Sequence, residues 1–404
     1  MKIVYFNYLY DLYEGAIGST IKAVEIMSAL EKQGHEVKIY WMNKKPENGN
    51  GKLSSKLRCS LKKRLDRYLH EPNQILKNLK HIYRENEIVK RENPDIVISR
   101  LDVYLFSSLV LTRVKKIPWL LEADGPGVYE GRRFFTHYKR LPWIDSYIET
   151  LNLKFADKVW LVSNASRDYF EKKGVLNEQM HVIPNGVDPG RYNPNIDSKE
   201  IKQRYNLQEK VVIGFIGSFH YWHGVENLIA LIDKVLLVKQ DVRFLLVGQG
   251  GAKEKELRDF VSTKGYEECV IFTGYVPHDE IPPYISVMDI VVAPYPKLDF
   301  FYYSPMKIYE YMACGKAVVA SKIGQIEEII KDGHDGILVE PDNIAELSDR
   351  VFQLVDNPKL RATIGTTAWN TVLKNHTWSN RAARVSQICE NIVSKKYEEM
   401  YNNN

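Results

Sequence analysis

The stretch from Phe300 to Ser321, FFYYSPMKIYEYMACGKAVVAS, decides the fold. A polar loop that contains Ser304 and Pro305 precedes a helical pattern, which ends at Gly315, where a left-handed cap costs little. A buried-type strand over 317–320 follows. The stretch therefore predicts a loop, a short helix and a strand, with the helix N-terminus at the edge of a sheet.

The polar groups of this unit suit a ligand that joins a diphosphate to a sugar. Backbone N–H groups at the start of the helix and the ammonium group of Lys307 favour phosphate. Glu310 lies inside the helix, where its carboxylate can accept hydrogen bonds from sugar hydroxyls. The candidate donor-binding residues of this stretch are Tyr302, Ser304, Pro305, Met306, Lys307 and Glu310.

The stretch resembles the donor-site segment of the retaining glycosyltransferases of family 4. That family usually carries two glutamates, the second of which opens Glu-Ala-Met-Ala-x-Gly. Here the second is Glu310, in Glu310-Tyr311-Met312-Ala313-Cys314-Gly315, and Tyr302 stands where the first is expected. The pattern is similar to the subgroup with Ser-Pro-x-Lys-x-x-Glu-Tyr-Met-Ala.

The remaining sequence alternates buried-type strands with helical patterns, which indicates α/β domains with parallel sheets. By resemblance, the fold is expected to be two Rossmann-like domains facing a cleft, the GT-B architecture. The predicted strands lie at 2–6, 36–41, 95–99, 119–122, 158–162, 211–216, 243–247, 289–293 and 317–320.

A chain of 404 residues is too long for one ordinary core, so two domains are expected. The turn Pro184-Asn185-Gly186-Val187-Asp188 resembles the family's passage between domains. We therefore expect an acceptor-side domain at 1–188 and a nucleotide-sugar-binding domain at 189–375. A C-terminal helix within 376–404 is expected to cross back to the first domain, as the resemblance implies.

Other candidate donor-binding residues follow glycine-bearing loops. The loop Gly15-Ala16-Ile17-Gly18 feeds a helix; alone it fits a plain tight turn equally well, but it resembles the family's glycine loop under the donor phosphates. Ser218 and His223 stand where the family usually has an arginine and a lysine that grip these phosphates. His223 can donate a hydrogen bond to a phosphate, and the alternative is a capping or packed histidine. Gly248 and Val276 complete the set, the latter in a loop that resembles the family's base-binding loop.

Asp124 is a candidate catalytic residue, together with Glu310 and Lys307. It follows a predicted strand and precedes Gly125-Pro126-Gly127, a place where open α/β sheets bind ligands. Many family members carry a histidine here, near the reacting sugar. A capping aspartate in a turn is the alternative.

Residues 52–70 combine a leucine at every fourth position from Leu53 to Leu69 with seven basic residues and one acidic residue. Such a helix can lie on an anionic membrane surface. We favour packing of the leucines on their own domain, and nucleic acid is not expected. A basic and aromatic run at 132–147 is a candidate acceptor-binding surface for a phosphorylated or lipid-linked sugar, with a solvated surface as the commoner alternative.

Composition narrows the remaining choices. No apolar run reaches the ~20 residues needed to span a bilayer, and no signal peptide is visible, so we expect a cytoplasmic protein, with peripheral contact to the inner face of the membrane as an option. The cysteines Cys59, Cys269, Cys314 and Cys389 are widely spaced. We therefore expect no metal and no cofactor.

The function that these features indicate is a retaining hexosyltransferase. The donor would be a nucleotide diphosphate sugar, UDP- or GDP-linked, and the acceptor a hydroxyl of a glycan, a lipid-linked sugar or a small molecule. A nucleotide-sugar-binding protein without transferase activity and a nucleotide-sugar epimerase remain alternatives. A nicotinamide oxidoreductase is disfavoured because neither glycine loop keeps a full G-x-G-x-x-G.

Overall fold

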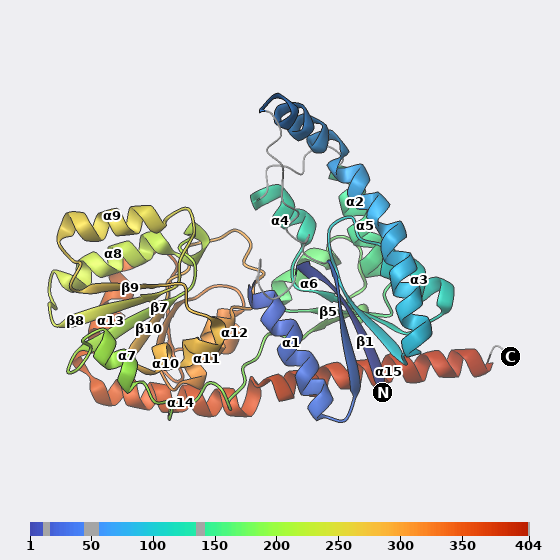
Figure 1. Ribbon diagram of the computed structural model, residues 1–404. Coiled ribbons are helices and arrows are strands. Elements are labelled where there is room, and N and C mark those ends of the chain that lie inside the picture. The colour runs from blue at the N-terminus through green and yellow to red at the C-terminus, as the bar shows by residue number, and fades with distance from the viewer. Residues whose placement is uncertain (11–16, 44–55, 135–141, 403–404) are drawn as a thin grey trace. The chain divides into compact units, whose positions relative to one another are not determined.

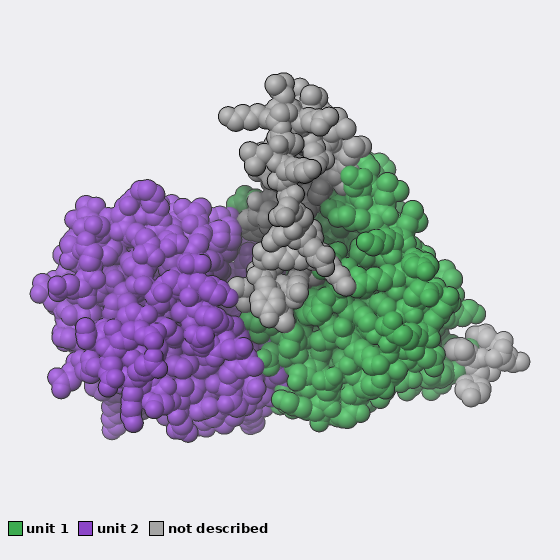
Figure 2. Space-filling view, in the orientation of Figure 1, with its two compact units in different colours: residues 1–184, 379–404 green, residues 185–378 purple. Residues whose placement is uncertain are grey.

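The computed structural model describes residues 1–10, 17–43, 56–134 and 142–402. The chain divides into two compact units, which Figure 2 distinguishes by colour. Unit 1 comprises Met1–Pro184 and Ser379–Asn404, and unit 2 comprises Asn185–Trp378. The chain thus changes unit between Pro184 and Asn185, and again between Trp378 and Ser379, where the sequence placed the boundaries after residues 188 and 375.

Unit 1 is built on a parallel sheet with strand order β2-β1-β3-β4-β5-β6. Its strands are β1 (Lys2–Tyr10), β2 (Glu36–Asn43), β3 (Ile96–Arg100), β4 (Trp119–Ala123), β5 (Lys158–Leu161) and β6 (Met180–Val182). Its helices are α1 (Ile17–Lys32), α2 (Lys56–Glu92), α3 (Ser107–Lys115), α4 (Gly127–Phe134), α5 (Pro142–Phe155), α6 (Asn164–Glu171) and α15 (Trp378–Asn402).

Unit 2 repeats this architecture with strand order β12-β11-β10-β7-β8-β9. Its strands are β7 (Val211–Ile216), β8 (Val242–Val247), β9 (Val270–Gly274), β10 (Ile290–Ala293), β11 (Ala317–Ser321) and β12 (Ile337–Val339). Its helices are α7 (Lys199–Arg204), α8 (Val225–Leu236), α9 (Glu254–Lys264), α10 (Ile281–Ser286), α11 (Met306–Ala313), α12 (Ile326–Ile329), α13 (Ile344–Asp356) and α14 (Pro358–Asn375).

Helices cover both faces of the sheet of unit 2, so its central strands are buried on both sides. One apolar cluster packs α8, α9 and α13 on one face. A second packs α10, α11, α12 and α14 on the other face (Figure 1). The predicted strands are all present, with small shifts at their ends, and the α/β fold class is confirmed.

The helical pattern predicted within 52–70 belongs to a longer helix. In the structure, α2 runs from Lys56 to Glu92 and contains Pro72. A proline removes one backbone donor and usually kinks or ends a helix, but here the helix continues past it. The side chains of residues 56–70, the loop at Gly15 and Ala16, and residues 135–141 of the basic and aromatic run lie outside the described side chains.

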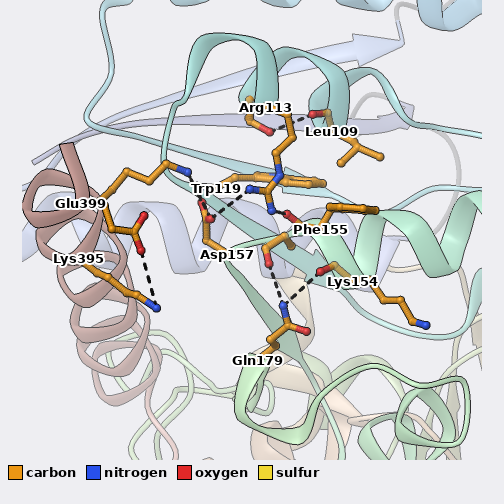
Figure 3. Close-up of polar contacts among 12 residues, drawn as sticks. Leu109, Arg113, Trp119, Lys154, Phe155, Asp157, Gln179, Lys395 and Glu399 are labelled. Atoms are coloured by element: carbon orange, nitrogen blue, oxygen red, sulfur yellow. Dashed lines mark hydrogen bonds and ion pairs between the residues drawn. The ribbon is translucent and has the colours of Figure 1, made fainter. Parts of the chain in front are cut away.

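The last helix, α15, is anchored to unit 1 by polar contacts. Figure 3 shows Asp157, whose carboxylate accepts a hydrogen bond from the backbone N–H of Trp119 at 2.8 Å. The same carboxylate pairs with Lys396 of α15 at 3.3 Å. Arg384 of α15 donates to the backbone oxygen of Val182 at 2.9 Å. These contacts join the end of the chain to the sheet formed by its beginning.

A buried carboxyl group, Glu85, lies between α2 and the sheet of unit 1. It accepts hydrogen bonds from the hydroxyls of Tyr8, at 2.6 Å, and Ser108, at 3.2 Å, and also from Ser107. Burial raises the pKa of Glu85 from its ordinary value of 4.5 to about 7, and these hydroxyls oppose the rise. The protonated form is therefore favoured in the folded state below about pH 7.

This raised pKa predicts a pH dependence of stability. Between pH 4.5 and 7 the folded state holds a proton that the unfolded state has lost, so the free energy of unfolding falls as pH rises, by up to about 1.4 kcal/mol per pH unit. We expect Glu85→Gln to reduce the loss of stability between pH 5 and pH 7.5, measured by urea unfolding. The same loss in variant and wild type would contradict this assignment.

Candidate functional site

The sequence-predicted residues of unit 2 gather at the carboxyl ends of the central strands β7 and β10. The chain leaves β7 towards β8 on one side and leaves β10 towards β11 on the other. Ligands bind α/β sheets at such a point, where the connections diverge. The loop after β7 carries Ser218 and His223, and the loop after β10 leads to Lys307 at the start of α11.

Glycines form the strand ends beside Lys307. Gly217 and Gly248 follow β7 and β8, with φ of 141° and 133°. A side chain at Gly248 would overlap the backbone oxygen of Gly217. A Cβ atom at Gly217 would lie 2.9 Å from Nζ of Lys307. Glycine at these positions therefore lets the backbone loops approach each other and leaves space for the ammonium group.

Lys307 is a buried cation. Within the described part of the chain, its Nζ has no hydrogen-bond partner. It lies 4.7 Å from the ring centroid of Phe215 and 5.5 Å from that of Tyr295. Burial lowers the pKa of Lys307 from 10.5 to about 8, and the nearby charge of Glu310 opposes this shift. The surroundings supply aromatic faces but no hydrogen-bonded counter-ion, an arrangement that favours binding of an anion.

His223 has a defined tautomer. Its Nδ1 lies 2.8 Å from the backbone oxygen of Ser218, which can only accept, so Nδ1 carries the hydrogen. Burial, and then the charge of Lys307, lower the pKa of His223 to about 3. The neutral ring therefore presents Nε2 as an acceptor. The sequence suggested that His223 donates a hydrogen bond to a phosphate. In this tautomer it can do so only after Nε2 takes up a proton.

Glu310 belongs to a neighbouring group of polar side chains, the Glu310 cluster, formed by Glu310, His278 and Tyr192. Nε2 of His278 lies 2.8 Å from Oε1 of Glu310 and 2.9 Å from the hydroxyl oxygen of Tyr192. The sequence predicted neither partner. His278 follows the predicted base-binding loop, which was the available signal, whereas Tyr192 lies in the segment after the linker and showed none.

Ser304 connects the predicted site to the start of unit 2. Its hydroxyl accepts a hydrogen bond from the backbone N–H of Asn185 at 2.9 Å, and its backbone oxygen accepts one from Nδ2 of Asn185 at 2.7 Å. Pro305 occupies the N-cap of α11, and no side chain caps this helix end. The N-terminal N–H groups of α11, beginning at Met306, are thus left without a capping side chain.

The other predicted residues of unit 2 have apolar surroundings. Tyr302 is buried, and its ring centroid lies 4.3 Å from that of Tyr303 and 5.2 Å from that of Phe300. Val276 packs against the core cluster that contains α11. These two residues shape the surroundings of the site through packing.

Two predicted residues belong to unit 1. Gly18 is exposed in the first turn of α1. Asp124, after β4, pairs with Arg100 at 2.6 Å and also with Lys22. Burial acts to raise the pKa of Asp124, but the charges of Arg100 and Lys22 outweigh it and hold the pKa well below its ordinary value of 3.8. Asp124 is therefore an ionised carboxylate with two cationic partners, and the sequence had signalled neither partner.

A second acid extends this group into the sheet of unit 1. Lys22 lies 2.6 Å from Oε1 of Glu122 and 4.2 Å from the ring centroid of Trp160. The other oxygen of Glu122 accepts a hydrogen bond from the hydroxyl of Tyr5. Two acidic and two cationic side chains thus form ion pairs in the interior of unit 1, whereas Lys307 of unit 2 has no such partner among the residues that the structure describes.

Comparison with known proteins gives matches in both units. Residues 18–191 match the family model "Glycosyltransferase Family 4", and residues 210–357 match the model "Glycosyl transferases group 1". Across the described residues, no helix has the length and apolar character needed to cross a membrane.

Individual relatives are more distant. An uncharacterized glycosyltransferase of Methanocaldococcus jannaschii is 27% identical over 253 residues, 62% of this chain and 62% of the relative. A GDP-mannose-dependent alpha-(1-6)-phosphatidylinositol monomannoside mannosyltransferase of Mycolicibacterium smegmatis is 27% identical over 238 residues, 58% of this chain and 62% of the relative. The chain therefore aligns with less than two thirds of the length of these curated relatives.

Solved structures share the fold over nearly the whole chain. The crystal structure of Anabaena HepE in complex with UDP has a TM-score of 0.72 and 19% sequence identity, and the match covers 97% of this chain and 100% of HepE. At this identity the likeness shows the fold. Each unit thus matches a glycosyltransferase family model, and the two-domain α/β fold is the GT-B architecture.

Proposed function

We propose that this protein is a retaining hexosyltransferase that takes its sugar from a nucleotide diphosphate donor and transfers it to an acceptor hydroxyl. The observation that carries the donor half of the proposal is the buried, unpaired ammonium of Lys307 beside the glycine ends of β7 and β8. A diphosphate supplies the negative charge that this ammonium lacks. The names of the relatives mention GDP-mannose and UDP, so both nucleotides are candidates.

In the proposed reaction the bond between the anomeric carbon and the diphosphate oxygen breaks, and the acceptor oxygen bonds to the same face of that carbon. Negative charge grows on the leaving diphosphate, which takes up the proton of the acceptor hydroxyl. Lys307 and the uncapped N–H groups of α11 would stabilise that charge electrostatically. His223 would add a hydrogen bond once protonated. Glu310 would accept hydrogen bonds from hydroxyls of the donor ribose. We propose that these roles are performed without a protein-held metal or cofactor.

The sequence suggested Asp124 as a catalytic residue, but we propose a structural role for it. An aspartate paired with Arg100 and Lys22 is a poor proton donor or acceptor near pH 7, because both cations favour its ionised form. We propose that Asp124 acts by holding these two cations in position in unit 1. Proton transfer to or from the acceptor hydroxyl is not assigned to it.

We also propose that unit 1 contacts an anionic membrane surface through α2, which would bring the enzyme to a lipid-linked acceptor. Leu76, Leu79 and Tyr83 are 59%, 67% and 71% exposed, and their spacing places them on one face of the helix. Lys77 and Lys80 are exposed beside them. Exposed apolar side chains flanked by lysines support membrane contact by this part of α2. The membrane contact that the sequence suggested involves residues 52–70, whose side chains are not described.

The donor proposal predicts opposite effects on stability and binding when Lys307 is replaced. We expect Lys307→Met to raise the free energy of unfolding of the ligand-free protein by roughly 1 to 3 kcal/mol, because it removes a buried unpaired charge. In wild type, UDP or GDP at ~100 times its Kd should add ~2.7 kcal/mol of stability, and Lys307→Met should lose this effect. Thermal and urea unfolding with UDP, GDP, ADP, dTDP and NAD measure both quantities.

Lys316 provides a matched control, since it is a second largely buried lysine of unit 2 whose Nζ does have a partner, the backbone oxygen of Ser286 at 2.8 Å. Lys316→Met should lower stability and retain the nucleotide effect. Stabilisation of wild type by NAD alone would contradict the donor proposal. Binding of a sugar nucleotide without transfer, or its conversion to an isomer without an acceptor, would instead identify the binding-protein or epimerase alternative.

The membrane proposal predicts a loss of binding when the exposed face of α2 is made polar. Wild type should float with vesicles that contain phosphatidylglycerol and much less with phosphatidylcholine vesicles, and a variant with Leu76, Leu79 and Tyr83 replaced by serine should remain in the aqueous fraction. Serine at Leu237 and Val238, each 67% exposed in unit 2, is the control and should float as wild type does. Equal flotation of all three proteins would exclude this face as the contact.

A further inference from the structure

The Glu310 cluster connects one carboxylate to two side chains from other parts of unit 2: His278 contacts Glu310, and Tyr192 contacts His278. Glu310 lies on α11, His278 begins the short 3-10 helix 278–280 that follows β9, and Tyr192 lies in the segment after the linker. The side chains of Glu310 and His278 are 7% and 19% exposed, and Tyr192 is buried. Three parts of unit 2 that are far apart in the sequence therefore meet at a single buried carboxylate.

The hydrogen positions in this cluster follow from chemistry. A carboxylate oxygen only accepts, so Nε2 of His278, 2.8 Å from Oε1 of Glu310, carries a hydrogen and donates it. The hydroxyl of Tyr192 lies 2.9 Å from the same Nε2, so Tyr192 contacts the imidazole that holds Glu310. Burial, together with the charge of Glu310, raises the pKa of Tyr192, so its hydroxyl keeps its proton.

The bond from His278, whose ring is in turn held by Tyr192, restricts a glutamate side chain that would otherwise sample several rotamers. Ordering a free glutamate side chain costs conformational entropy. His278 and Tyr192 meet this cost during folding, before any ligand arrives. A carboxylate held in one orientation can accept hydrogen bonds from two adjacent hydroxyls of a sugar without paying the cost again on binding.

We propose that His278, supported by Tyr192, is a positioning residue that fixes Glu310 for the ribose diol and so makes the protein prefer ribonucleotide over 2′-deoxyribonucleotide donors. This inference rests on the proposed function, in which Glu310 binds the ribose of the donor. Loss of one hydroxyl leaves a buried carboxylate partly unpaired, and sites of this kind reject the ligand that lacks the group. Discrimination therefore depends on how firmly the carboxylate is held.

The test compares Kd values for UDP with 2′-deoxy-UDP, and for GDP with 2′-deoxy-GDP, by calorimetry on the full chain. Wild type should prefer the ribonucleotide by ~10-fold or more. His278→Ala should bring this ratio close to one by weakening the ribonucleotide, with little change for the deoxyribonucleotide. His278→Gln should restore part of the ratio, because its amide N–H can replace the Nε2–H donor.

Two further variants separate the possible failures. Glu310→Gln should abolish the preference, and His334→Ala, which removes an imidazole 57% exposed elsewhere in unit 2, should leave it intact. A wild-type ratio preserved in His278→Ala would overturn the positioning role while the donor proposal stands. An unchanged ratio in Glu310→Gln would overturn the ribose contact itself. Wild type that binds none of these nucleotides would overturn the proposed function, and the positioning role with it.

Discussion

The proposed ligand site of unit 2 depends on one buried, unpaired ammonium group, that of Lys307. The ammonium of Lys307 is buried against the rings of Phe215 and Tyr295, and in the described chain it has no hydrogen-bond partner. Burying such a charge destabilises a fold. Glycine at position 217 preserves the space around the ammonium group, and glycine at position 248 lets the loops after β7 and β8 approach each other. Such an arrangement is expected where stability is given up for binding.

In unit 1, by contrast, the buried charged side chains form ion pairs. Lys22 and Arg100 are compensated by Asp124 and Glu122, and α15 is tied to the sheet through Asp157. Ion pairs of this kind fix local geometry. Lys307 of unit 2 has no such partner in the described part of the chain, so it is better suited to bind an anionic ligand.

The sequence predicted the central strands and the position of Lys307 because both depend on local patterns: continuous apolar runs and a loop that feeds a helix. The strands it did not name, β6, β9 and β12, are edge strands, which are short or only half-buried and show no such run. The partners of Glu310 and Asp124 were missed for another reason. These acids meet their partners, Tyr192, His278 and Arg100, through tertiary contacts. Local spacing in the sequence does not predict contacts of this kind.

The most direct measurement is a crystal structure with the nucleoside diphosphate that stabilises the protein. We expect a phosphate oxygen roughly 2.7–3.0 Å from Nζ of Lys307, at the carboxyl ends of β7 and β10. We also expect that the ribose lies against Glu310 and that the bond from Glu310 to His278 is retained. A diphosphate bound elsewhere, with Lys307 still buried and unpaired, would contradict the central claim.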